Sequence, residues 1–100
     1  MAGPRFWTHG ISYELTDLAP EVGDLVNLRI LNLNNNALKK LPHEIENLKS
    51  LESLHLRHNQ LDCLIPEIGQ LKNLKTFDLS DNEIRKLPKE IGKLKNLESL

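Results

Sequence analysis

The chain has 100 residues, with 13 basic and 14 acidic side chains and a formal net charge of -1. A chain of this length supports at most one domain core. A charge this close to zero creates no long-range field, so we expect neither nucleic acid nor a membrane surface as a direct partner. The single Cys63 cannot form an internal disulfide, and no Asn-x-Ser/Thr acceptor occurs. These features, and a start without a signal-peptide pattern, predict a cytoplasmic or nuclear location.

Residues 1–27 carry a faint version of a pattern that becomes regular at Leu28. Four of their apolar residues each lie 23 residues before an apolar residue of the next unit: Leu15, Leu18, Val22 and Leu25. The strand half of this segment fits only if Ile11 takes an inner strand position and one residue is missing before Leu15. Terminal repeats are often atypical because they cover an otherwise bare core. We therefore interpret residues 1–27 as an N-terminal cap with a degenerate repeat.

Three regular repeats follow, at residues 28–50, 51–73 and 74–96, and they align without gaps. Each opens with the pattern LxxLxLxxNxL. Its members are Leu28, Leu31, Leu33, Asn36 and Leu38, then Leu51, Leu54, Leu56, Asn59 and Leu61, then Leu74, Phe77, Leu79, Asn82 and Ile84. This pattern resembles the leucine-rich-repeat family, in its typical intracellular 23-residue subclass.

The physical interpretation of one repeat agrees with this resemblance. Alternation around Asn32 predicts a short strand with Leu31 and Leu33 buried and Asn32 exposed. The following Asn36 suits a turn, and stacked copies of it are expected to form a ladder of hydrogen bonds. The second half of the unit has the apolar spacing of a short helical turn opened by proline. One repeat cannot bury enough surface to fold alone, so the units must stack.

The predicted fold is α/β, a leucine-rich-repeat solenoid. It has a short parallel β-sheet on the concave face and helical or irregular turns on the convex face. Residues 97–100 begin another repeat and stop. We therefore expect the chain to be a fragment of a longer protein and its uncapped C-terminal end to self-associate non-specifically.

The side chains that point out of the strands define a candidate partner-binding set on the concave face. In four columns across the repeats, its members are Ile30, Ser53 and Thr76; Asn32, His55 and Asp78; Asn34, Arg57 and Ser80; and His58 and Asp81, with Asn35 completing the last column. Neighbouring strands lie about 4.8 Å apart, so His55 is expected to meet Asp78, and His58 to meet Asp81.

This surface has three candidate uses. Two histidines and two aspartates could bind a metal, but a flat face offers no closing ligand. A hydrolytic site would need an enclosed water or a nucleophile, and the pattern supplies neither. A polar surface that binds a protein partner fits best. We expect no catalytic, metal or cofactor site in this segment.

A narrower resemblance concerns Trp7, the segment Asp81-Asn82-Glu83-Ile84-Arg85-Lys86-Leu87-Pro88 and residues 97–100. These are similar to the N-terminal repeat region of the deadenylase subunit of the CCR-NOT complex. In that family the repeats dock a second deadenylase subunit and a poly(A)-specific nuclease domain follows. The resemblance implies an alternative function in messenger RNA deadenylation, as a fragment without its nuclease domain.

Overall fold

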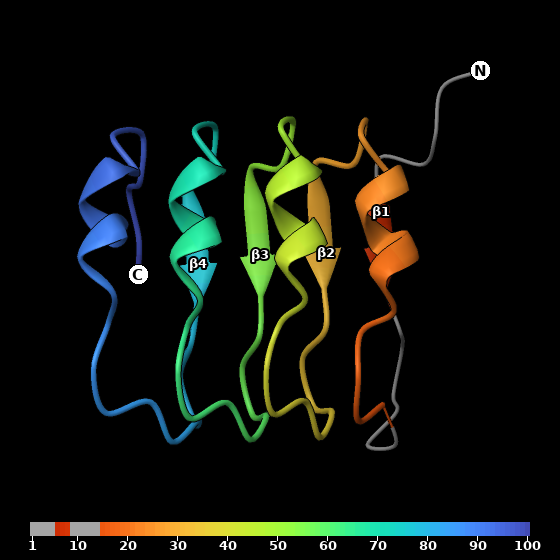
Figure 1. Cartoon of the computed structure of the whole chain (residues 1–100), viewed down its shortest axis with the longest axis vertical. Coiled ribbons are helices and arrows are strands. Elements are labelled where there is room, and N and C mark those ends of the chain that lie inside the picture. Colours follow the sequence, from red (N-terminus) through yellow and green to blue (C-terminus); the bar gives the residue numbers. More distant parts are fainter. Residues whose placement is uncertain (1–5, 9–14) are drawn as a thin grey trace.

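A computed structural model describes residues 6–8 and 15–100 of the chain. Within these residues, short strands alternate with short 3-10 helices, and each strand–helix pair is one turn of a right-to-left row of repeats in Figure 1. The elements are β1 (Phe6–Thr8), η1 (Pro20–Asp24), β2 (Ile30–Asn32), η2 (His43–Asn47), β3 (Ser53–His55), η3 (Pro66–Gln70), β4 (Thr76–Asp78) and η4 (Lys89–Lys93).

The strands form one parallel sheet in the order β1-β2-β3-β4, which is also their order along the chain. Leu31 pairs with Leu54, and Leu54 pairs with Phe77, so each repeat sits one strand further along without slipping. A slip of one residue would turn every leucine of the strand toward solvent. The 23-residue period therefore determines the register of the sheet.

The core lies between the sheet and the row of 3-10 helices. The central residues of β2, β3 and β4 are fully buried, while the residues on either side of them are half-buried. Ile45 and Ile68 close the core from the helical side and are also fully buried. The predicted strand and convex turn of each repeat, and with them the solenoid, are confirmed.

Proline marks the start of each 3-10 helix, at one of two positions. Pro66 is the first residue of η3, whereas Pro42 and Pro88 lie one residue before η2 and η4. Proline has no N–H to leave unpaired in the first helical turn, and its fixed φ suits that turn. Both positions give a helix of the same five-residue length, so the one-residue shift of Pro66 in the second repeat is a local adjustment.

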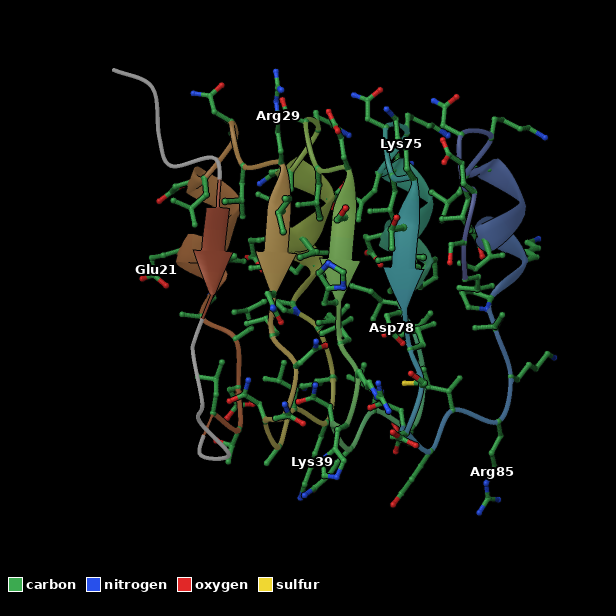
Figure 2. All side chains as sticks on the ribbon, turned by 180° about the vertical axis from the view of Figure 1, so that it is seen from behind. Glu21, Arg29, Lys39, Lys75, Asp78 and Arg85 are labelled. Atoms are coloured by element: carbon green, nitrogen blue, oxygen red, sulfur yellow. The ribbon has the colours of Figure 1, made fainter. Side chains whose placement is uncertain are left out.

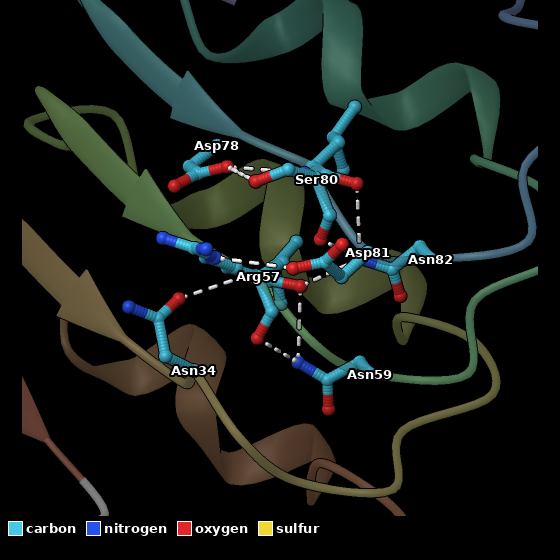
Figure 3. A network of polar contacts seen from close by, with 9 residues as sticks. Asn34, Arg57, Asn59, Asp78, Ser80, Asp81 and Asn82 are labelled. Carbon is cyan, nitrogen blue, oxygen red and sulfur yellow. Dashed lines mark hydrogen bonds and ion pairs between the residues drawn. The ribbon is translucent and has the colours of Figure 1, made fainter.

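Buried asparagines connect consecutive repeats. The amide nitrogen of Asn59 donates to the carbonyl oxygens of Leu56, at 3.1 Å, and of Leu33 in the preceding repeat, at 3.0 Å. Its amide oxygen accepts from the backbone N–H of Leu38 at 3.1 Å. Asn36 and Asn82 occupy the same position in their own repeats, and Asn82 repeats this pattern on Leu56, Leu79 and Leu61. Figure 3 includes Asn59 and Asn82. The predicted asparagine ladder, Asn36, Asn59 and Asn82, is confirmed.

The N-terminal cap departs from its predicted alignment. Ile11, the expected inner strand residue, lies outside the described residues, and the described strand is β1, in which Trp7 pairs with Leu31. Leu15 is equivalent to Leu38. The carbonyl oxygen of Leu15 accepts from the N–H of Ala37, and that of Leu38 accepts from the N–H of Gln60, 23 residues later. The segment from Trp7 to Leu15 is therefore one residue longer than that from Leu31 to Leu38. The expectation of one missing residue was wrong, because the strand forms earlier in the chain.

Glycines on the 3-10 helices allow close packing between repeats. A Cβ atom on Gly69 would lie 2.8 Å from the backbone oxygen of Glu90, and one on Gly23 would lie 3.0 Å from that of Glu44. The equivalent Gly92, on η4, meets nothing within 4 Å. Residues 97–100 begin the next strand position through the pairing of Thr76 with Ser99, and Leu100 is 58% exposed. Self-association through this end stays a prediction.

Replacing Asn59 with alanine is expected to lower the free energy of unfolding by about 3 kcal/mol, because several buried backbone groups lose their partners at about 1 to 3 kcal/mol each. Urea denaturation followed by circular dichroism measures this. Asn73→Ala is the control, since that side chain is exposed and makes one bond, to the carbonyl oxygen of Lys49. Equal effects of the two substitutions would refute a special role for the buried ladder.

Gly69→Ala is expected to destabilise the fold by about 1 to 3 kcal/mol, because the new methyl group overlaps the backbone at Glu90. Gly92→Ala meets open space and should change stability by less than about 0.5 kcal/mol. Parallel denaturation curves of the two variants test the contrast. A Gly69→Ala protein as stable as the parent chain would show that the helices do not pack this closely.

Candidate functional site

Two of the four predicted columns of the candidate surface lie on the sheet itself. Ile30, Ser53 and Thr76 pair in register at the start of the strands, and Asn32, His55 and Asp78 pair in register at their ends. All six are half-buried and alternate with the buried central residues. Figure 2 shows Asp78 at the end of β4 on the exposed side of the sheet. The structure therefore brings these six residues together on one face, as the sequence predicts.

The other two columns lie beyond the strands. Asn34, Arg57 and Ser80 follow them, and the next residues, Asn35, His58 and Asp81, adopt left-handed backbone angles with φ near +60°, the individual values being 61, 60 and 58. The prediction that they lie on strands was wrong. The chain turns there so that the ladder asparagine one residue later can reach inward, and Asn, Asp and His tolerate that backbone conformation best among residues with a side chain.

Arg57 is held in place by contacts with both neighbouring repeats. Its Nε donates to Oδ2 of Asp81 at 3.2 Å, and its backbone N–H donates to the side-chain oxygen of Asn34 at 2.8 Å, as Figure 3 shows. The side chains of Arg57 and Asp81 remain 60% and 55% exposed. Asp81 thus pairs with Arg57 rather than with His58, which was expected to meet it. Asp81 lies one position beyond the residue that is equivalent to Arg57 in the next repeat, and the long arginine side chain can reach it. An alignment of equivalent positions does not predict such a contact.

Asp78 is fixed by its own turn. Its Oδ1 accepts hydrogen bonds from the hydroxyl of Ser80 and from the backbone N–H of Ser80, the latter at 3.0 Å. The Ser80 hydroxyl, then the Ser80 N–H and electrostatic interactions with Arg57 and His55 hold the pKa of Asp78 below its ordinary value, while partial burial opposes them. Asp78 is therefore an oriented anion at neutral pH. His55 is its register partner, as predicted.

Other chemistry finds little support in the described part of the chain. No cluster of three or more His, Cys, Asp or Glu side chains in residues 6–8 and 15–100 could hold a metal ion. Cys63 is exposed, and a hydrogen bond to Asp62 raises the pKa of its thiol, with burial adding to the effect. A thiol shifted in this direction is less often the reactive thiolate. None of the described helices has the length and apolar character needed to cross a membrane.

A second set of asparagines was missed by the sequence analysis. The amide nitrogen of Asn73 donates to the carbonyl oxygen of Lys49 at 2.8 Å, and that of Asn96 donates to Lys72 at 2.9 Å. The signal was present, because Asn27, Asn73 and Asn96 share one position of the 23-residue period, with Ser50 between them. These bonds order the turns that precede the strands, on the edge of the sheet opposite to the first ladder.

A parallel one-strand-per-turn sheet, a ladder of asparagines and a backing row of short helices define a repeat solenoid of the leucine-rich class. A family model described as leucine-rich repeat region matches residues 12–100. The chain belongs to the leucine-rich-repeat family.

Two solved structures illustrate the similarity. A leucine-rich-repeat protein of Leptospira interrogans is 43% identical, with a TM-score of 0.83, over 86% of this chain and 24% of its own. Internalin C2 of Listeria monocytogenes is 28% identical, with a TM-score of 0.75, over 87% of this chain and 37% of its own. The chain thus spans well under half the length of either structure. No protein with a curated description matches by sequence. Nothing in these matches supports the narrower resemblance to a CCR-NOT deadenylase.

Ser80→Ala is expected to raise the pKa of Asp78 toward its ordinary value, because the carboxylate loses the hydroxyl donor that contributes most to the shift. The backbone N–H donor remains, so the return is partial. A lowered pKa stabilises the fold at pH values above the pKa of Asp78 in the unfolded chain, and this stabilisation is lost as the pH falls through the folded-state pKa. Because Ser80→Ala removes part of this stabilisation, the variant should lose less stability on acidification than the parent chain. A carboxyl NMR titration measures the midpoint. Ser53→Ala, on the same face, is the control, and an unmoved midpoint in Ser80→Ala would contradict the assignment.

Proposed function

We propose that this segment is a protein-interaction module whose concave surface binds a partner protein. The concave surface comprises Ile30, Asn32, Asn34, Ser53, His55, Arg57, His58, Thr76, Asp78, Ser80 and Asp81. The observation that carries the proposal is the fixed pair of Arg57 and Asp81 beside the oriented carboxylate of Asp78. Family membership supports the general role, since leucine-rich-repeat modules typically bind proteins.

Preorganisation favours binding at this surface. Immobilising a long side chain costs about 0.5 to 1.5 kcal/mol when an interface forms. The side chain of Arg57 already pairs with Asp81, the backbone N–H of Arg57 is bound by Asn34, and Asp78 is held by Ser80. Only the Nε of Arg57 is used, so its remaining N–H groups can donate to a partner carboxylate or carbonyl. A partner would therefore meet side chains that lose little freedom.

The polar character of the surface changes from one repeat to the next. The first repeat contributes neutral asparagines, the second contributes Arg57 with two histidines, and the third contributes Asp78 and Asp81. A partner that places an acidic group on the second repeat and a basic group on the third would match this order. Such complementarity determines orientation and specificity more than overall affinity.

Catalysis forms no part of this proposal, because the surface is open and supplies no activated nucleophile. We propose that the partner is met in the cytoplasm or nucleus, on the basis of the single cysteine and the missing glycosylation acceptors. The self-association expected at the C-terminal end is a separate contact that does not use the concave surface.

Arg57→Glu is expected to weaken partner binding by about 2 kcal/mol or more, roughly thirtyfold, while changing stability by under about 0.5 kcal/mol. The measurement is retention of the partner from cell extract on the immobilised protein. Lys89→Glu, on the convex η4, makes the same change of charge and serves as the control. Circular dichroism verifies that both variants are folded. Loss of the partner with Lys89→Glu but not with Arg57→Glu would assign binding to the convex side.

A further inference from the structure

Positive charge gathers along one edge of the solenoid, away from the concave surface. This edge is the one at which the strands begin. It consists of the turns that lead from each 3-10 helix into the next strand position, at residues 25–29, 48–52, 71–75 and 94–98. Figure 2 shows two of its members, Arg29 and Lys75, at the same edge of the molecule. Its basic residues are Arg29, Lys49, Lys72, Lys75 and Lys95, and its acidic residues are Glu52 and Glu98. The whole chain has a net charge of -1, so this edge departs from the balance of the rest.

Three of these lysines form a row, which we term the lysine row: Lys49, Lys72 and Lys95. They are spaced by 23 residues and all are exposed. The side chains of Asn73 and Asn96 donate to the carbonyl oxygens of Lys49 and Lys72, at 2.8 and 2.9 Å. The backbone of the row is thereby held in register from repeat to repeat, so the lysine charges are aligned rather than scattered.

The neighbouring row differs from the lysine row. Reading across the repeats, it alternates in sign as Arg29, Glu52, Lys75 and Glu98, and consecutive members are joined by backbone hydrogen bonds. Alternating charges one strand apart offset one another. The ion pairs found among the described residues are His43 with Glu44 and Arg57 with Asp81, so none of them neutralises the lysine row.

We infer that the lysine row binds an acidic segment of a protein that lies across the repeats. Lysine is a flexible point charge with three donors, which suits carboxylates whose spacing is not fixed by a rigid scaffold. A nucleic acid fits less well, because single-strand binding usually combines basic groups with aromatic side chains that stack on bases. The described part of this edge has no Phe, Trp or Tyr. The inference is independent of the concave surface, since it uses different residues on a different edge.

Position 26 provides a direct test of alignment. Val26 occupies the place of the row in the N-terminal cap, 23 residues before Lys49, and is 51% exposed. Val26→Lys would extend the row from three lysines to four. Gln60→Lys adds the same charge at an exposed position of a turn that follows a strand, on the opposite edge. If alignment matters, the first substitution strengthens binding and the second does not.

The probe is a fluorescently labelled peptide of six glutamates, titrated with the 100-residue chain at low salt and followed by fluorescence anisotropy. We expect binding that weakens as salt rises, since exposed charge pairs are screened. Lys72→Glu should weaken it about tenfold, and Val26→Lys should strengthen it about threefold. Lys39→Glu, on the opposite edge in Figure 2, makes the same charge change as Lys72→Glu and should have little effect. Circular dichroism verifies the fold of each variant.

Three results would overturn the inference. The first is no binding of the peptide at low salt. The second is an equal loss with Lys39→Glu and Lys72→Glu, or an equal gain with Gln60→Lys and Val26→Lys, since either shows a response to net charge alone. The third is tighter binding of a thymidine oligomer of equal charge, which would assign the edge to nucleic acid. Because Arg57→Glu leaves the lysine row intact, its effect on the concave surface can be separated from all of these.

Discussion

The buried asparagine is the interaction on which the rest of this structure depends. Asn59 joins three backbone segments, since it bonds to Leu56 in its own repeat and to Leu33 and Leu38 in the preceding one. A backbone group buried without a partner costs about 1 to 3 kcal/mol, and the turns after the strands would otherwise leave several such groups unpaired. The amide supplies both a donor and an acceptor at one point, which an apolar residue cannot do. Each repeat therefore needs its neighbour for hydrogen bonding as well as for burial.

The same constraint organises the candidate surface. For the ladder asparagine to point inward, the residue before it adopts φ near +60° in all three regular repeats. Asp81 is one of these left-handed residues, and its carboxylate accepts a hydrogen bond from Nε of Arg57 in the preceding repeat. One partner of the exposed ion pair therefore lies directly before a ladder asparagine, Asn82. Side chains in the second and third positions after each strand are displayed by a turn, which is more open to substitution than a packed strand.

Stacking also explains why two sides of the molecule differ in their polar groups. The first ladder lies where the strands end, and the asparagines of the second ladder, Asn73 and Asn96, lie where the strands begin. The first is buried at Asn36 and Asn59 and half-buried at Asn82, and it serves stability, whereas the second is exposed and holds the backbone of the lysine row. A solenoid in which each repeat contacts only its neighbours places every position of the period in a row. An exposed residue type that recurs at one position of the period therefore forms a continuous row on the surface.

The sequence by itself determined the class of fold, the inward positions of the strands and the existence of the asparagine ladder. These follow from a gapless 23-residue period, because a repeated local pattern has one way to bury its leucines and pair its turns. It also identified His55 and Asp78 as neighbours, since they share a column. Only the tertiary structure decided that Arg57 pairs with Asp81 and that the last column lies on left-handed turns. An alignment of the repeats shows which residues share a position, but it shows neither how far a long side chain reaches nor which backbone angles a turn adopts. The cap shows the same limit: with no regular period before Leu15, the place of β1 at Phe6–Thr8 came from its pairing with β2. Local periodicity specifies where a repeat sits, and contacts between repeats specify what its exposed side chains do.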